Sequence, residues 1–207
     1  MSALGLYSRS YLPLLIVIAG PSGVGKDTIA RQLIATNPRQ FYFVVTATTR
    51  PPRPGETQGV DYFFVSTAEF ARMINENELV EYAFVYNDYK GVPKQQIRDA
   101  LASGKDVIMR VDVQGAASLR RLIPNAVLVF LSAESEESMI GRLRARSSES
   151  LGELNLRVAT ARQEFKRLSE FDYWVINPDG RPEQAVQEIL CIIHAERNRV
   201  GREPIAL

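Results

Sequence analysis

The residues best suited to chemistry lie between Leu14 and Thr28, in the sequence LLIVIAGPSGVGKDT. An apolar run typical of a β-strand leads directly into Gly20-Pro21-Ser22-Gly23-Val24-Gly25-Lys26, and a helical pattern follows. This is the P-loop pattern in its expected context, where backbone N–H groups and a helix N-terminus bind phosphate. The Lys26 side chain can reach the outer phosphates. We therefore predict that this segment binds the phosphate chain of a nucleotide.

Asp27 occupies the position where this motif usually has a serine or threonine that binds magnesium. Three interpretations stay open. The carboxylate binds Mg²⁺ directly, since it is a hard oxygen ligand; it acts on the metal through water while Thr28 supplies a hydroxyl; or it is an ordinary helix N-terminal residue favoured by the dipole. We favour the second interpretation, which places Asp27 and Thr28 near the metal of MgATP.

A second group of phosphate-binding candidates lies in residues 46–56, which read TATTRPPRPGE. Arg50 and Arg53 present planar guanidinium groups suited to bidentate phosphate contacts, and the prolines reduce the entropy lost on ordering the loop. Tyr62, in the following GVDYFFVS, adds a hydroxyl. An exposed polar turn would explain this loop if it stood alone. Together with the P-loop and a lid, it predicts two phosphorylated ligands bound face to face.

The elements that must position these residues alternate between strand-like and helical patterns, which is typical of an α/β fold with a mainly parallel sheet. Two regions break the alternation. Residues 46–92 include a helix with a capping box at Ser66-Thr67-Ala68-Glu69, and residues 141–162 are rich in arginine. We interpret them as an inserted lobe and a helical lid that excludes water. Strands are expected at residues 14–19, 41–45, 106–111, 127–131 and 173–176, and helices at 28–36, 93–102 and 181–199.

Composition excludes several classes of function. The 207 residues fit one domain, and the net charge of +1 gives no general signal for nucleic acid or a membrane surface. The apolar segment 12–19 is too short to span a bilayer. The single cysteine, Cys191, is interpreted as a core residue, and zinc chemistry is not expected because His194 is the only histidine. We expect a cytoplasmic monomer or homodimer that binds neither nucleic acid nor membrane.

The order of these segments resembles the guanylate kinase family. The shared text runs from GPSGVGK through TATTRPPRPGE, GVDYFFVS and VDVQGA to the lid and the INPDG segment at Asn177. It covers nearly the whole chain, and TTRPPRPGE followed by GVDYFFVS is its most specific part. The resemblance implies a P-loop nucleoside monophosphate kinase fold at residues 13–198, between tails at 1–12 and 199–207. It also implies ATP-dependent phosphorylation of GMP, and of dGMP, with Mg²⁺.

The resemblance further implies a role for individual residues. ATP would be bound by the loop, the helix start and one later residue: Gly20, Pro21, Ser22, Gly23, Val24, Gly25, Lys26, Asp27, Thr28 and, next to the adenine, Asn177. GMP would be bound by hydroxyl, basic and acidic side chains: Thr46, Arg50, Arg53, Tyr62, Glu81, Lys90 and Asp112. The Glu81 carboxylate can accept from both donors of the guanine edge, which adenine lacks. Charge on the transferring group would be neutralised by Lys26, Arg142, Arg146 and Arg157.

Three further residues depart from the family pattern together with Asp27. Lys90 replaces a phosphate-binding tyrosine, and an ammonium there can still bind an anion. Val92 stands where a base-contacting hydroxyl is usual, and Arg110 where an acidic residue is usual. The set GKD, YKGVPK and RVDVQGA is similar to the plant organellar branch of the family and its bacterial relatives, and it favours a working variant. Because no transit-peptide pattern is present, we expect a bacterial or mature form.

Two alternative functions stay open. A non-catalytic guanylate-kinase-like binding module would keep the fold and lose ATP-site residues, whereas Lys26, the loop glycines and the lid arginines are present here. A related P-loop kinase acting on ribose bisphosphate can also carry GKD. The arginine loop and Glu81 favour a nucleotide as the acceptor.

Overall fold

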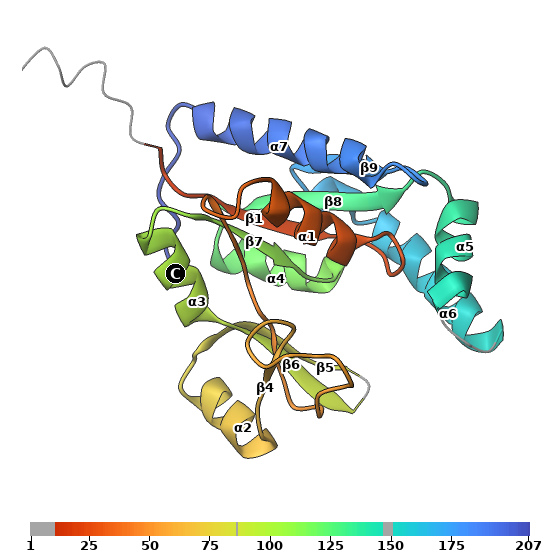
Figure 1. The fold of residues 1–207 in the computed structure, drawn as a ribbon, viewed down its shortest axis with the longest axis horizontal. Coiled ribbons are helices and arrows are strands. Elements are labelled where there is room, and N and C mark those ends of the chain that lie inside the picture. Colours follow the sequence, from red (N-terminus) through yellow and green to blue (C-terminus); the bar gives the residue numbers. More distant parts are fainter. Residues whose placement is uncertain (1–10, 86, 147–150) are drawn as a thin grey trace, which may run out of the picture.

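The computed structural model describes residues 11–85, 87–146 and 151–207. Five strands form a parallel sheet in the order β2-β7-β1-β8-β9 (Figure 1). These strands are β1 (Leu15–Ala19), β2 (Phe41–Phe43), β7 (Asp106–Arg110), β8 (Val127–Ala133) and β9 (Tyr173–Asn177). All five strands expected from the sequence are present, and their ends differ from the expected ones by at most two residues. The predicted α/β fold with a mainly parallel sheet is confirmed.

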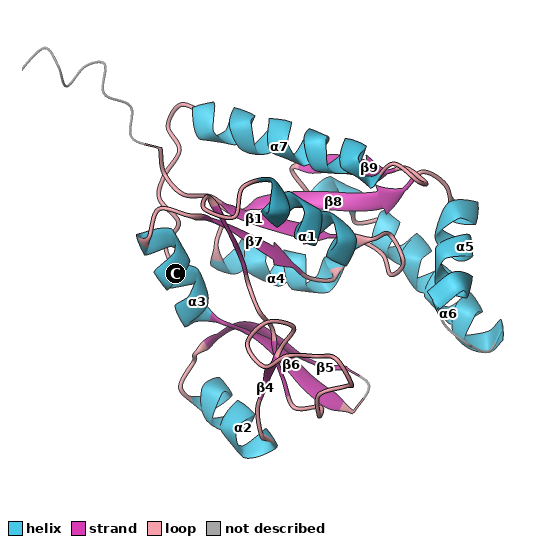
Figure 2. Cartoon of the chain, in the orientation of Figure 1, coloured by secondary structure: helices cyan, strands magenta, loops and turns pink. Residues whose placement is uncertain are grey.

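Helices cover both faces of this sheet (Figure 2). They are α1 (Lys26–Thr36), α3 (Lys94–Ala102), α4 (Val113–Leu122) and α7 (Pro182–Asn198). The central strand β1 is buried along its whole length, as a strand covered on both faces must be. Ile16 and Ile18 pack with residues of α1 and α7, whereas Leu15 and Val17 pack with residues of α3 and α4. The alternation along β1 thus joins two apolar layers into one core.

The parallel arrangement places the carboxyl ends of β1 and β7 side by side. Ile18 of β1 is paired with Arg110 at the end of β7. The P-loop follows β1 directly, and Asp112 follows β7, where its side chain caps α4. Ligands of open parallel sheets bind at this edge, so the fold brings the two segments to the place where a nucleotide would bind.

A separate lobe is built on a second sheet in the order β4-β3-β6-β5 and lies below the main sheet in Figure 1. Its elements are β3 (Ala47–Thr48), β4 (Phe63–Phe64), α2 (Thr67–Asn75), β5 (Leu79–Val85) and β6 (Asp88–Pro93). The Ser66 hydroxyl accepts a hydrogen bond from the Glu69 amide at 3.1 Å, as the capping pattern predicts. Phe70 and Met73 of α2 pack on the sheet in a small core of their own.

The lid region contains two helices, α5 (Glu136–Arg146) and α6 (Leu151–Phe165). Leu143 and Leu154 are buried against the main core, and Arg162 donates two hydrogen bonds to Glu136, at 2.8 and 2.6 Å. The arginine-rich region is therefore anchored at both helices. Residues 147–150 of the predicted lid, and residues 1–10 of the predicted N-terminal tail, lie outside the described part of the chain.

The position of Cys191 on α7 differs from the expected one. Cys191 is exposed, so the interpretation of it as a core residue is wrong. The buried face of α7 is formed by its neighbours, including Ile189, Ile192 and Ile193, and Cys191 lies on the opposite side. Among the described residues, the longest helices are too short or too polar to cross a membrane.

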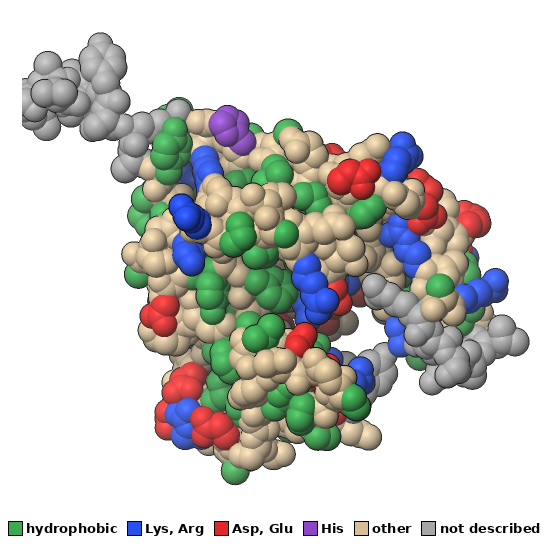
Figure 3. All heavy atoms as spheres, in the orientation of Figure 1, with side chains coloured by type: hydrophobic (Ala, Val, Ile, Leu, Met, Phe, Trp, Pro, Cys, Tyr) green, Lys and Arg blue, Asp and Glu red, His purple; other side chains and the backbone are tan. Residues whose placement is uncertain are grey.

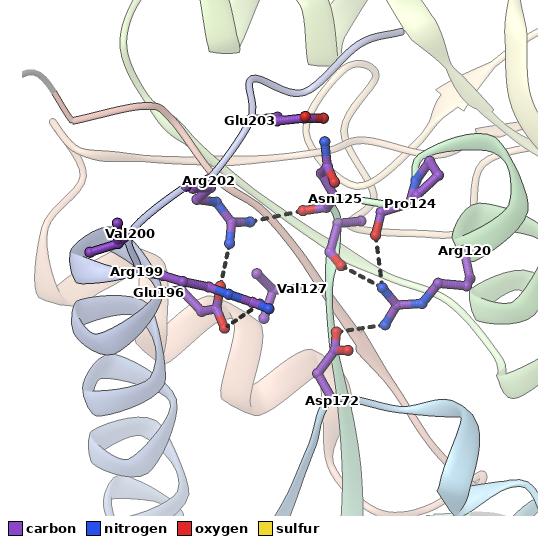
Figure 4. A pocket seen from close by; sticks show the side chains of 12 residues that line it. Arg120, Pro124, Asn125, Val127, Asp172, Glu196, Arg199, Val200, Arg202 and Glu203 are labelled. Atoms are coloured by element: carbon purple, nitrogen blue, oxygen red, sulfur yellow. Dashed lines mark hydrogen bonds and ion pairs between the residues drawn. The ribbon is translucent and has the colours of Figure 1, made fainter.

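A pocket of about 480 Å³ lies at the opposite edge of the sheet, beside the start of β8 (Figure 4). Its charged side chains bind each other. Arg120 donates to Asp172 at 2.6 Å, and Arg202 and Arg199 both pair with Glu196. The following residues Ile205 and Leu207 pack against the core. These ion pairs therefore hold the C-terminal segment to the core, and they neutralise the Arg120, Arg199 and Arg202 side chains of the pocket.

Candidate functional site

The P-loop is shaped by glycines that no other residue could replace without movement. A Cβ at Gly20, where φ is +147°, would lie 2.1 Å from the Leu131 carbonyl oxygen. A Cβ at Gly25, where φ is +93°, would lie 2.6 Å from Asn177 Nδ2. Lys26 Nζ donates to the carbonyl oxygens of Gly20 and Pro21 at 2.6 and 2.8 Å. The loop thus holds its ammonium group against its own backbone.

Two of the predicted lid arginines contact this loop. Arg142 donates from Nη1 to the Val24 carbonyl at 3.2 Å and from Nε to Asp179 at 2.7 Å. Arg157 Nη1 donates to the Ser22 hydroxyl at 3.1 Å. The side chain of the third, Arg146, lies outside the described residues. The structure therefore brings cations from both lid helices to the rim of the P-loop.

Asn177, expected next to the adenine, also supports the loop. Its side chain is buried, and Nδ2 donates to the Val24 carbonyl at 2.8 Å. A pocket of about 320 Å³ opens beside it and is lined by Gly23, Gly25, Thr28, Arg142, Asn177, Pro178 and Asp179, among others. Asp179 was not predicted as a site residue, although it belongs to the INPDG segment. One pocket thus joins the P-loop, the lid and the end of β9.

The arginine loop forms a basic cluster in the lobe. The Arg50 guanidinium lies 4.8 Å from the centre of the Tyr62 ring, and Lys90 Nζ lies 6.0 Å from the same centre. Burial lowers the pKa of Lys90, and the nearby charges of Arg50 and Arg53 lower it further. A partly buried ammonium beside two guanidinium groups creates a strong local potential for an anion.

Glu56 holds this loop in shape. Its two carboxylate oxygens accept from Arg50 at 2.7 and 2.5 Å, and one also accepts from the Arg53 amide at 2.8 Å. The hydrogen bonds from Arg50, and then that from Arg53, lower the pKa of Glu56 to about 2. We did not predict a role for Glu56 from the sequence, although it closes the TTRPPRPGE motif.

Glu81 and Asp112, expected near the guanine, face each other across the base of the lobe. Burial, and then the charge of Asp112, raise the pKa of Glu81 to about 7. Thr46 is half-buried beside β3. Val92 is only 2% exposed and packs in the main core, and its side chain has no hydroxyl with which to hydrogen-bond a base.

Glu164 is a further acidic group that sequence reasoning missed. Burial raises its pKa, whereas the charge of Lys26 lowers it and that of Asp112 raises it. These influences place its carboxylate near both the P-loop lysine and the end of β7. The spacing along the sequence could have indicated this position, because Glu164 follows Arg157 by two helical turns and the two residues therefore share a face of α6.

A cleft of about 760 Å³ separates the lobe from the core and opens to solvent (Figure 3). Its core wall includes Asp27 and Arg110, and its lobe wall includes Glu56 and Tyr62. Across it, Arg31 of α1 lies 3.6 Å from Asp61 of the lobe. The cleft thus lies between the first turns of α1, which directly follow the P-loop, and the part of the lobe that carries Glu56 and Tyr62. It adjoins the phosphate-binding loop on one side and the basic cluster on the other, an arrangement that can hold two phosphorylated ligands together.

Comparisons with known proteins agree with this geometry. The family model described as guanylate kinase matches residues 13–196. The chain is 50% identical over 194 residues to guanylate kinase 2, chloroplastic/mitochondrial, from Oryza sativa subsp. japonica, covering 93% of this chain and 68% of that protein. It is 38% identical to the guanylate kinase of Clostridioides difficile (strain 630), covering 91% of each.

Among solved structures, the crystal structure of guanylate kinase from Anaplasma phagocytophilum matches with a TM-score of 0.73 and 27% identity, covering 93% of this chain and 90% of that one. The sequence matches and the structural match all extend over the core, the lobe and the lid. The chain belongs to the guanylate kinase family.

Proposed function

We propose that this protein transfers the γ-phosphoryl group of ATP to the phosphate of GMP, or of dGMP, and releases ADP and GDP. The observation that carries the proposal is the cleft between core and lobe: one wall includes Asp27 and Arg31 of α1, directly after the P-loop, and the other includes Tyr62, over whose ring the Arg50 guanidinium lies. The names of its relatives support GMP as the acceptor.

Two groups of basic residues bind the two phosphorylated substrates. Lys26, Arg142 and Arg157 surround the P-loop and neutralise charge that develops on the transferring group. Arg50, Arg53, Tyr62 and Lys90 bind the acceptor phosphate. No general base is needed, because the acceptor oxygen already belongs to an anion. Catalysis then depends on alignment and on charge stabilisation.

Glu81 selects the base. Its ionised carboxylate accepts from N1–H and from the 2-amino group of guanine, and Asp112 and Thr46 line the same site. Adenine presents neither donor on that edge, so AMP would leave a buried carboxylate without partners, which is costly.

The oxygen donors near the phosphates fit Mg²⁺. The Thr28 hydroxyl lies in the first turn of α1, and the carboxylate of Glu164 lies within electrostatic range of both Lys26 and Asp112. These are hard ligands of the kind that Mg²⁺ takes, either directly or through water. When bound, the ion would neutralise phosphate charge and fix the geometry of the triphosphate. Asp27 is engaged by Arg110.

We further place the protein in the cytoplasm as a monomer or homodimer. The near-neutral net charge supports a protein that needs neither membrane nor nucleic acid. Cell fractionation and light scattering of the purified chain test the two points, and membrane recovery or a higher oligomer would contradict them.

A coupled ADP-release assay tests the proposal. GMP, dGMP, AMP, UMP and ribose bisphosphate are offered with ATP while Mg²⁺ is varied. We expect turnover with GMP and dGMP only, and dependence on Mg²⁺. Turnover with ribose bisphosphate would support the related P-loop kinase instead, and ATP that stays intact with every acceptor would support the non-catalytic binding module.

A further inference from the structure

Arg110 and Asp27 form an ion pair at the edge of the nucleotide site. Arg110 Nη1 contacts Asp27 Oδ1. The two residues are far apart in sequence, and they meet because Arg110 ends β7 beside Ile18 of β1, whose chain then passes through the P-loop into α1. Asp27 directly follows the P-loop lysine in the first turn of α1.

Each of the two side chains carries a charge that the other neutralises. The Arg110 side chain is 24% exposed, and burial lowers its pKa, so its charge requires a counter-charge. Asp27 places a carboxylate immediately beside the loop that must hold a polyphosphate, where an unbalanced negative charge repels the ligand. Both side chains also line the cleft that contains the lobe's Tyr62. The pair is thus placed between the P-loop and the acceptor side.

We propose that Arg110 is a positioning residue that neutralises Asp27, so that Asp27 serves as the fixed partner of Arg110 and does not act as a magnesium ligand. The inference rests on the proposed function, because it concerns the nucleotide site of that reaction. The guanidinium contacts Asp27 Oδ1, and coordination of a metal through that oxygen would break the pair and leave the Arg110 charge unbalanced.

A double-mutant cycle separates the two roles of Asp27. Binding of ADP is measured by calorimetry in EDTA, without metal, for the wild type, Arg110→Gln, Asp27→Asn and the double variant. We expect Arg110→Gln to weaken ADP binding on the order of tenfold, since it exposes the phosphates to an unbalanced carboxylate. The double variant should return to within about threefold of the wild type, because it removes both charges.

Two further variants serve as controls. Arg31→Gln removes an equal charge one helical turn further along the same face of α1, from a side chain that is 78% exposed, and should change ADP binding less than about threefold. Arg110→Lys retains a cation and should bind ADP nearly as the wild type does. Thermal melts of every variant identify any that do not fold, and the Lys variant then carries the comparison.

A Mg²⁺ titration of nucleotide binding tests whether Asp27 binds the metal. With Asp27→Asn the midpoint should stay within about threefold of the wild type, and metal-free ADP should bind at least as tightly, because a negative charge has been removed. A tenfold shift of the midpoint in both Asp27→Asn and the double variant would assign Asp27 to the metal and overturn the inference. A double variant that binds ADP no more tightly than Arg110→Gln would overturn the inference too.

Absence of GMP-dependent turnover in the wild type would instead refute the proposed function. The ADP-binding measurements on the four proteins would still test the interaction between Arg110 and Asp27.

Discussion

Glu81 and Gly115 fit together so closely that a Cβ on residue 115 would lie 2.9 Å from Glu81 Oε2. The same Cβ would lie 3.0 Å from the Val111 Cβ, a side-chain atom that cannot move without its backbone. Gly115 thus leaves the space that the Glu81 carboxylate, the proposed selector of guanine, occupies.

Gly115→Ala should therefore displace Glu81 and raise the KM for GMP on the order of tenfold, since a misplaced carboxylate loses charged hydrogen bonds. The KM for ATP should stay within about threefold, because the donor pocket is lined by other residues. Steady-state kinetics with each substrate varied measure the split.

Gly141→Ala is the matched control for this glycine change. Gly141 lies inside α5, and a Cβ there meets nothing within 4 Å. It should leave the KM for GMP unchanged and raise stability by about 0.5–1 kcal/mol, through better helix propensity. An equal rise of the KM for GMP in both variants would contradict the proposed contact between positions 81 and 115.

The pKa of Glu81, raised to about 7, predicts a pH dependence of GMP binding. Only the ionised carboxylate accepts from both guanine donors, and the ionised fraction grows as the pH rises through 7. The KM for GMP should therefore fall between pH 6 and pH 8. The GMP phosphate also titrates near pH 6, so Glu81→Gln supplies the reference profile, and the two profiles should diverge as the pH rises through 7.

Glu81→Gln itself should raise the KM for GMP by about tenfold or more, because the amide offers one acceptor and adds a donor against the guanine edge. The KM for ATP should change much less. Equal changes in the two constants would show that Glu81 does not select the base.

Lys26→Ala should reduce kcat about 10²- to 10³-fold, as loss of a single charge-stabilising donor does elsewhere. Its Nζ donates to the Gly20 and Pro21 carbonyl oxygens of its own loop, so we expect the fold to persist and circular dichroism to show an unchanged spectrum. Lys166→Ala, at an exposed position of the chain, is the control and should keep its turnover. Near-normal activity of Lys26→Ala would refute the catalytic role.

Arg50→Lys should raise the KM for GMP more than Arg53→Lys. The Arg50 side chain is 11% exposed, is bound in bidentate fashion by Glu56, and lies over the Tyr62 ring, which an ammonium cannot reproduce. Arg53 is exposed, and its bond to Glu56 comes from its backbone amide. Steady-state kinetics with GMP varied compare the two variants. If the KM for GMP rises equally in both, or more in Arg53→Lys, the Arg50 guanidinium is not the main contact of the acceptor phosphate.

Much of this molecule could be predicted from local pattern. The run Leu14–Ala19 is apolar without interruption and is followed by glycines, which is enough to place a buried strand and a phosphate loop. Ser66 and Glu69 mark a helix start by themselves. Each of these features depends on residues close together in the chain.

The parts that could not be predicted depend on residues brought together by the sheet. The pairing of Asp27 with Arg110 follows from the β1–β7 register, and the position of Glu164 follows from how α6 packs over the P-loop. Cys191 was misplaced because an apolar stretch of helix does not by itself show which of its sides faces the core.

The central place of β1 has a consequence for how the chain acquires its structure during synthesis. β1 emerges first from the ribosome, yet its partners β7 and β8 begin only at residues 106 and 127. Contacts between distant segments form late and slowly, and domains assemble as their last required segment becomes available. The P-loop, although encoded near the start of the chain, is therefore built only after more than half of the chain has been translated. A nascent chain stalled before residue 106 would carry the complete P-loop sequence without being able to retain a nucleotide.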